Sequence, residues 1–223
     1  MFCYDSPEYV KDMGTPDRYK EVVNDFNRGI ITSKNLLNKQ KAIFLDRDGT
    51  INKYKGFLRD IDSFELIPGI AKAIKKINES GYLAIVVTNQ PVIARGEVTL
   101  ELLNMIHNKM ETLLGFEGAY INAIYFCPHH PHKGYAGEIV EFKKNCDCRK
   151  PKPGMLLRAS QEFNIDLSHS FMIGDSENDI KTGIAAGCKI ILVRGEDTSH
   201  EIGEFGQIAT VNSVNEFVEK YID

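Results

Sequence analysis

The chain has 223 residues, of which 43% are hydrophobic and 26% are charged, a composition typical of a globular protein with a hydrophobic core. Its formal net charge of −4 argues against general electrostatic binding to nucleic acid or to an anionic membrane. The first residues lack the apolar run of a signal peptide, and no stretch is long and apolar enough for a transmembrane helix. We therefore expect a cytoplasmic protein.

The segment 1–40 differs from the rest of the chain. Apolar residues at helical spacing predict one amphipathic helix over 17–28, with Tyr19, Val22, Val23 and Phe26 on one face. The flanking residues predict an extended leader and a linker. We therefore expect 1–40 to lie outside the main domain.

From residue 41 onward, short apolar runs alternate with helical patterns. Strands are expected over 41–46, 82–89, 121–127, 170–175 and 189–195. Helices are expected between Gly69 and Gly81, from Thr99 to a stop at Gly115, and over 153–164, 177–186 and 213–222. This alternation predicts a doubly wound, parallel α/β domain over 41–223.

Two carboxylates follow the first expected strand. Asp46 and Asp48 come directly after the apolar run 42–45 and just before Gly49 and Thr50. Residues two apart on an extended chain share a face, so both carboxylates can point into one pocket at the strand's carboxyl end. Two carboxylates this close repel each other and lose hydration, which a divalent cation such as Mg²⁺ can offset.

The segment Asp-x-Asp-Gly-Thr, residues 46–50, resembles the opening motif of the haloacid dehalogenase superfamily. This resemblance implies that Asp46 attacks a phosphoryl group and becomes an aspartyl-phosphate, while Asp48 acts as general acid and then general base. Both roles suit the chemistry. Attack by a carboxylate divides one displacement into two easier steps, and a departing alkoxide needs a proton.

Three later segments complete the superfamily pattern in order. Thr88 follows an apolar run, where its hydroxyl can hold phosphoryl oxygens, and Lys150 provides a fixed positive charge. Asp175 ends another expected strand, and Asp179, one helical turn later, is expected to orient its neighbours rather than to touch the metal. The magnesium contacts implied by the resemblance are the carboxylates of Asp46 and Asp175 and the backbone carbonyl of Asp48.

Cysteine and histidine are concentrated in 127–148. Three of the five cysteines lie there, in a chain without a signal peptide, which favours a metal site over a disulfide framework. A Cys-x-His pair and a Cys-x-Cys pair supply the donors of a closed tetrahedral Zn²⁺ site. The expected ligands are Cys127, His129, Cys146 and Cys148. The alternative is a loop of unligated cysteines beside solvated histidines. We expect His130 and His132 to be solvated histidines of this kind.

The same loop is similar to that of D-glycero-D-manno-heptose 1,7-bisphosphate phosphatases and of histidinol-phosphate phosphatases. The similarity covers about 41–220 and includes FLDRDGTIN, VVTNQ, IARG, CPHHP, CDCRKPKPGM and IGD. It implies that zinc folds a loop beside the active site and that Cys148 tethers Arg149 and Lys150. The substrate-binding residues that it implies are Tyr54, Lys55, Gly56, Phe57, Asn89, Gln90, Arg149 and Ser176, with Thr88 in the phosphate pocket.

Some features bear on the substrate. The chain has Pro91 and Val92 where the family often has Ser-Gly, and Ser176 where some relatives have a lysine, so the sugar and its anomer stay open. The loop between His129 and Cys146 is longer than is usual in histidinol phosphatases, which favours a heptose bisphosphate over histidinol phosphate. Too little chain separates the first two motifs for an inserted cap domain, so we expect the capless branch and a small sugar phosphate as substrate.

Residues 9–19 resemble the end of sugar-1-phosphate nucleotidyltransferase domains. The resemblance implies a relic of a transferase–phosphatase fusion, or a pathway partner with that activity, and it favours an α-heptose. The alternative is a chance turn before a helix. A 3′-phosphatase acting on nucleic-acid ends is disfavoured, because the chain has no basic stripe. A non-catalytic module bound to a nucleotidyltransferase would have no need of Asp46, Asp48, Lys150 and Asp175 together.

Overall fold

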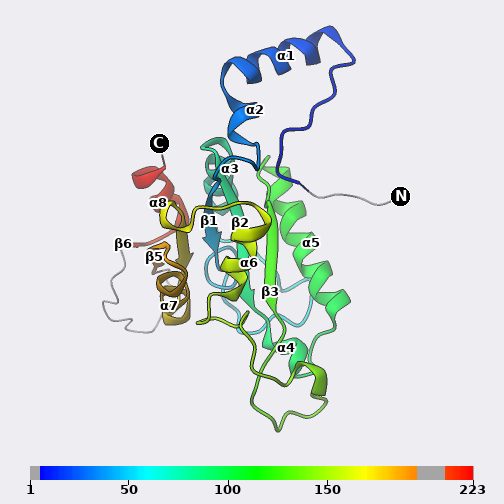
Figure 1. The fold of residues 1–223 in the computed structure, drawn as a ribbon. Helices are drawn as coiled ribbons and strands as arrows, with labels where there is room; N and C mark the ends of the chain where they lie inside the picture. The colour runs from blue at the N-terminus through cyan, green and yellow to red at the C-terminus, as the bar shows by residue number, and fades with distance from the viewer. Residues whose placement is uncertain (1–5, 195–208, 223) are drawn as a thin grey trace.

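Parallel strands dominate the computed structural model of the chain, which describes residues 6–194 and 209–222. Within these residues, one sheet has the strand order β3-β2-β1-β4-β5-β6, and every neighbouring pair is parallel. The strands are β1 (Lys41–Leu45), β2 (Tyr82–Asn89), β3 (Ala123–Cys127), β4 (Phe171–Gly174), β5 (Lys189–Val193) and β6 (Ala209–Val211) (Figure 1). The predicted fold class is confirmed.

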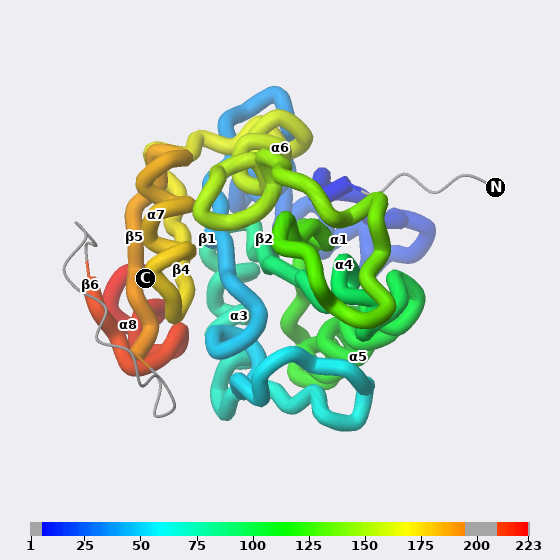
Figure 2. Tube along the Cα trace, turned by 90° about the horizontal axis from the view of Figure 1, so that it is seen from below, coloured from blue at the N-terminus to red at the C-terminus, as the bar shows by residue number. Residues whose placement is uncertain are grey.

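Helices cover both faces of this sheet (Figures 1 and 2). One face packs against α3 (Ile70–Glu79), α5 (Leu100–Phe116) and α8 (Val214–Tyr221), and the other against α6 (Gly154–Glu162) and α7 (Glu177–Ala186). Strand β1 shows why two cores form. Ile43 and Leu45 join the first core, whereas Ala42 and Phe44 join the second, because alternate side chains of a strand point to opposite faces.

The predicted elements are shifted slightly at their ends. The helix expected to stop at Gly115 continues to Phe116, because glycine inside a helix costs only about 1 kcal/mol, and Gly118, with φ 74°, follows its end. Strand β3 begins at Ala123 rather than at 121, and Gly195 lies outside the described residues. The structure adds β6, the short α4 (Pro91–Ala94), and the 3₁₀ helices η1 (Val140–Phe142) and η2 (Leu167–His169).

The leader forms α1 (Pro16–Asn27) and α2 (Ile30–Ser33), at the end of the molecule opposite α4 (Figure 1). Thr15 caps α1 by accepting a hydrogen bond from the Arg18 N–H. The apolar face predicted for this helix exists, but the domain does not cover it, since Tyr19 is 58% and Phe26 67% exposed. No helix in the described ranges is long and apolar enough to cross a membrane.

Candidate active site

The strand order brings together segments that are far apart in the sequence. Asp46 follows β1, Thr88 lies at the end of β2, and Asp175 follows β4. Strand β1 lies between β2 and β4, and the helices that follow β1 and β4 cover opposite faces of the sheet. This point is the crevice in which open α/β sheets bind ligands.

Three carboxylates and one lysine form the centre of the site. Oxygen atoms of Asp46, Asp175 and Asp179 lie within 4.8 Å of one another. The Lys150 ammonium lies 2.8 Å from Asp46 Oδ1 and 2.6 Å from Asp179 Oδ1, and it donates to the carbonyl of Val87 at 3.0 Å. If all three acids were ionised, one cation would not balance them, so full ionisation of the cluster requires a further positive charge.

Burial and repulsion act on the protonation of this cluster. Burial, followed by the charge of Asp179, raises the pKa of Asp46 to about 8. The same two causes raise the pKa of Asp175 to about 7. Burial alone would lower the pKa of Lys150, but the charges of Asp179 and Asp46 outweigh it, and the net shift is upward. Lys150 therefore stays protonated, whereas Asp46 and Asp175 resist ionisation at the same time.

The backbone is built to hold these acids close together. Gly49 adopts φ +85°, and a Cβ there would lie 2.0 Å from Asp175 Oδ2. Excess buried carboxylate charge and clustered oxygen donors are what a hard divalent cation requires, so the residues present fit Mg²⁺. Asp179 uses one oxygen for Lys150 and the other for the N–H and hydroxyl of Ser176. Both of its oxygens are thus engaged with neighbouring residues, and the orienting role stays a prediction.

Asp48 lies in a different environment from Asp46. Its carboxylate accepts hydrogen bonds from Arg47 Nη2 at 2.8 and 2.9 Å, from Gln90 Nε2 at 2.9 Å and from Asn52 Nδ2 at 3.0 Å. Gln90 Nε2 also donates to the Thr88 hydroxyl at 3.0 Å. Donors from three directions therefore fix the orientation of this carboxylate.

Arg47, which was not among the predicted site residues, is fully buried. Its Nη1 lies 3.2 Å from His107 Nε2 on α5, and burial, followed by the charge of Arg47, lowers the pKa of His107 to about 4. Neutral His107 can then accept a hydrogen bond from the guanidinium. The available signal was an arginine between two carboxylates directly after a buried strand, where a buried guanidinium requires polar partners.

Asn89 makes contacts different from those of its neighbours. Its side-chain amide donates to the Lys150 carbonyl at 3.0 Å and accepts from the Lys150 N–H at 3.0 Å. Its groups are thus engaged in holding the backbone of the lysine, whereas Gln90 donates to both Asp48 and the Thr88 hydroxyl. A direct contact between Asn89 and substrate stays a prediction.

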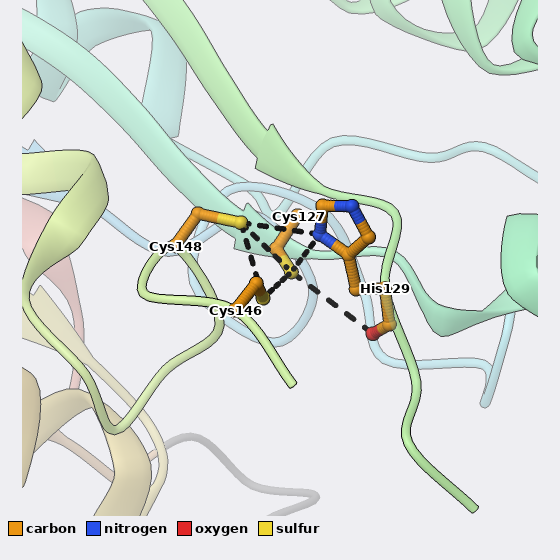
Figure 3. Close-up of side chains that lie close together, drawn as sticks. All are labelled: Cys127, His129, Cys146 and Cys148. Atoms are coloured by element: carbon orange, nitrogen blue, oxygen red, sulfur yellow. Dashed lines mark hydrogen bonds between the residues drawn. The ribbon is translucent and has the colours of Figure 1, made fainter. Parts of the chain in front are cut away.

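The predicted zinc ligands converge in the loop that follows β3 (Figure 3). Cys148 Sγ lies 3.4 Å from Cys127 Sγ and 3.3 Å from Cys146 Sγ, and His129 Nδ1 lies 3.3 Å from Cys148 Sγ. These cysteines form no disulfide. Three thiol sulfurs and one imidazole nitrogen gathered around a common centre are the donor set of a closed tetrahedral Zn²⁺ site.

One assignment in this loop was wrong. His130 is buried, only 6% exposed, whereas we had expected it to be solvated, and His132 is exposed. His130 Nε2 lies 3.5 Å from Arg95 Nη2, and its Nδ1 lies 3.3 Å from the His132 carbonyl. Burial, with the nearby charges of Arg149, Arg95 and Lys143, lowers the pKa of His130. The loop folds over this ring, which a count of loop histidines does not reveal.

Four of the predicted substrate-binding residues are consecutive in the sequence, in the segment that follows the Asp48 motif. Phe57 packs against the Arg95 guanidinium, Tyr54 is 57% exposed, and Lys55 pairs with Glu65 at 3.3 Å. Gly56, between them, adopts φ 71°.

The other two predicted contacts are held by their own neighbours. Arg149 Nη1 donates to the His129 carbonyl at 3.1 Å. The Ser176 hydroxyl donates to Asp179, so this side chain supports the acid cluster. Contacts of these residues with substrate stay predictions.

Comparisons with known proteins agree with this geometry. A family model described as HAD-hydrolase-like matches residues 147–217. The D-glycero-beta-D-manno-heptose-1,7-bisphosphate 7-phosphatase of Yersinia pestis is 42% identical over 175 residues, which are 78% of this chain and 90% of the relative. The enzyme of the same name from Escherichia coli K12 is 41% identical over 162 residues, which are 72% of this chain and 83% of the relative.

A solved structure shares both the fold and the sequence similarity. It is the D,D-heptose 1,7-bisphosphate phosphatase from B. bronchiseptica complexed with magnesium and phosphate. It superimposes with a TM-score of 0.71 at 31% identity and covers 81% of this chain and 97% of its own. The chain therefore belongs to the heptose bisphosphate phosphatase family of HAD-like hydrolases, and its activity is that of a phosphatase.

Proposed function

We propose that this enzyme removes the 7-phosphate of D-glycero-β-D-manno-heptose 1,7-bisphosphate. The observation that carries the proposal is the 2.8 Å contact between Asp46 and the Lys150 ammonium at the carboxyl end of β1, where Asp48 follows two residues later. This arrangement supplies a nucleophile, a cation for the phosphoryl group and a second carboxylate. Relatives named for this reaction are similar over most of the chain, which supports the substrate.

The anomer follows from the same comparison. The relatives are named for the β anomer, whereas the transferase-like leader favours the α anomer. We adopt β because the relatives are similar over 78% of the chain, while the leader resemblance spans only residues 9–19.

The reaction begins with the phosphoryl group held by the Lys150 ammonium and the Thr88 hydroxyl. Asp46 attacks phosphorus, and the bond to the sugar oxygen breaks as the aspartyl-phosphate forms. Asp48 supplies the proton that the departing alkoxide needs. Ionised Asp48 then takes a proton from the water that attacks the intermediate. The contacts from Arg47 and Gln90 keep its carboxylate in place for both steps.

Each metal has a separate role in this proposal. Asp46, Asp175 and the backbone carbonyl of Asp48 would hold Mg²⁺, which neutralises charge on the transferring phosphoryl group. The cluster of three cysteines and one histidine would hold Zn²⁺ with no position left for water, so that its role is structural. Because Cys148 directly precedes Arg149 and Lys150, order in this loop places the phosphate-binding lysine.

A substrate panel tests the proposal. The panel compares both heptose 1,7-bisphosphate anomers with histidinol phosphate, and ³¹P NMR identifies the phosphate that is lost. We expect the highest kcat/KM for the β anomer and loss of the 7-phosphate, because the primary phosphate is the less hindered end. A higher kcat/KM for histidinol phosphate, or prior loss of the 1-phosphate, would refute the proposal. A higher kcat/KM for the α anomer would instead support the anomer that the leader favours.

A further inference from the structure

Positive charge exceeds negative charge around His130. Arg95, Lys143 and Arg149 all lie close enough to affect this ring electrostatically. Lys143 has a carboxylate partner, Glu138, at 3.4 Å. Among residues 6–194 and 209–222, neither arginine has a carboxylate within ion-pair distance, in contrast to Arg47 and Arg59. Two guanidinium groups without a counter-charge make this side of the site attractive to an anion.

Arg95 is held in a fixed orientation by aromatic rings. Its guanidinium carbon lies 4.6 Å from the centre of the Phe57 ring and 4.6 Å from that of Tyr135. The Nε atom is buried and makes no hydrogen bond, and Nη2 has only the long 3.5 Å contact with His130. The rings restrict the plane of the guanidinium and leave most of its hydrogen-bonding capacity unused.

The backbone around Arg95 is clamped by the zinc-binding loop. The Ile139 N–H donates to the Ala94 carbonyl at 3.0 Å. Gly96 adopts φ +71°, and a Cβ at this position would lie 1.8 Å from the Gly137 carbonyl oxygen. The two segments are therefore in direct backbone contact, and the position of Arg95 depends on the loop that also carries Arg149.

The two arginines are connected along the chain, or through one ring contact, to segments that carry the reaction centre. Arg149 is the chain neighbour of Lys150, whose ammonium lies 2.8 Å from Asp46. Phe57, which stacks on Arg95, belongs to the segment that follows the Asp48 motif. A substrate with one phosphate at Asp46 and a second phosphate at its other end is the kind of ligand that Lys150 and these arginines could hold together.

We propose that Arg95 acts with Arg149 as the binding site for the second phosphate of a bisphosphate substrate, and that it determines the preference for a bisphosphate over a monophosphate. The inference rests on the function proposed above. A planar guanidinium can form two parallel hydrogen bonds to a phosphate, which a lysine cannot. Phe57 and Tyr135 hold it ready for that geometry, so little side-chain entropy is lost on binding.

The experiment compares the parent enzyme with Arg95→Gln, Arg95→Lys and a matched control, Arg59→Gln. Arg59 is a surface arginine, 57% exposed at its side chain, that pairs with Glu97. The substrates are heptose 1,7-bisphosphate, heptose 7-phosphate and p-nitrophenyl phosphate, of which only the first carries a second phosphate. Charged hydrogen bonds of this kind contribute roughly 10- to 100-fold in binding.

We expect Arg95→Gln to lower kcat/KM for the bisphosphate by about 10- to 100-fold, mainly through KM, and to change the two monoesters by less than about threefold. Arg95→Lys should recover part of the loss, and Arg59→Gln should leave all substrates unchanged. Equal losses on all substrates would show a structural role for Arg95 and overturn the inference, as would an unchanged preference for the bisphosphate. If the parent itself shows no such preference, the proposed substrate fails instead.

Discussion

Two carboxylates that are neighbours in one motif have different surroundings. Asp46 contacts Lys150 within a buried group of acids, whereas Asp48 accepts hydrogen bonds from Arg47, Gln90 and Asn52. The first environment suits a nucleophile beside a metal and a phosphate. The second holds a proton-transfer group still. The different roles of Asp46 and Asp48 thus follow from the groups that each carboxylate contacts.

At this scale, Asp46→Asn should lower kcat by about a thousandfold or more, because an amide cannot attack phosphorus or balance the charge of Mg²⁺. Asp17→Asn is the control, since that carboxylate is 92% exposed on α1. Steady-state rates with a saturating substrate provide the measurement. A loss smaller than tenfold would remove Asp46 from the nucleophile's role.

Asp48→Asn should depend on the leaving group. A sugar alkoxide needs a proton as it departs, so we expect a loss of about 10²- to 10⁴-fold on the heptose substrate. An aryl phosphate such as p-nitrophenyl phosphate departs without that help and should lose much less. The ratio of the two losses is the measurement. Equal losses would contradict the assignment of Asp48 as general acid.

Among the elements of the fold, the loop after β3 connects the most parts of the site. It carries three of the four clustered donors, while Cys127 ends β3. The loop also contacts the backbone at the end of α4 and leads into Arg149 and Lys150. In small loops, metal binding supplies order that backbone hydrogen bonds alone do not. Lys150 is also held from β2 through Asn89. Order in the loop and the position of the lysine are therefore coupled.

We expect one tightly bound Zn²⁺ per chain in protein purified without added zinc. Cys146→Ser should lose it, whereas Cys188→Ala should keep it, because Cys188 is buried in the core that includes α6 and α7. Removing zinc should raise KM for the phosphate ester, since Arg149 and Lys150 lose their support. Elemental analysis and steady-state kinetics are the measurements. A parent enzyme without zinc, or with a Cys146–Cys148 disulfide, would contradict the site.

At the scale of the whole molecule, the buried acids link metal binding to pH. Without a bound cation, the pKa values of about 8 for Asp46 and about 7 for Asp175 exceed the roughly 4 of an unfolded chain. Their contribution to stability is therefore full below about pH 4 and is lost as pH rises through 7 and 8. A cation that binds the ionised acids reverses this loss.

At a fixed Mg²⁺ concentration, the increase in Tm should be larger at pH 9 than at pH 6, because at the lower pH protons compete for the same carboxylates. Differential scanning calorimetry of the zinc-loaded protein measures this. In Asp175→Asn, the pH dependence of the increase should shrink. An increase in Tm that is equal at both pH values, or larger at pH 6, would contradict the proposed metal ligands.

The boundary between leader and domain can also be tested. We propose that residues 41–223 fold without the leader, since α1 buries no residue. In the part of the leader that the structure describes, the hydrogen bonds to the domain come from residues 36–40, just before β1. Deleting residues 1–34 should keep kcat/KM within about twofold and change Tm by less than about 4 °C. A large loss of either would show that the leader is part of the catalytic unit.

The sequence by itself determined the strands β1 to β5 and the helices α1, α3 and α5 to α8, with their order, whereas β6 and the short helices were found only in the structure. An apolar run such as 82–89 predicts a buried strand, and a capped segment such as 177–186 predicts a helix. Each pattern involves residues only a few positions apart. The Asp46 motif and the paired cysteines were visible for the same reason, since each is a local pattern.

Only the tertiary structure decided which distant residues meet. The order β2-β1-β4 brings Asp175 against Gly49, and the folded loop buries His130 beside Arg95. Arg47 contacts His107 on α5, far along the chain, whereas no residue of α1 is buried against the domain. Such contacts depend on packing of the whole chain, and no periodicity within a short window records them.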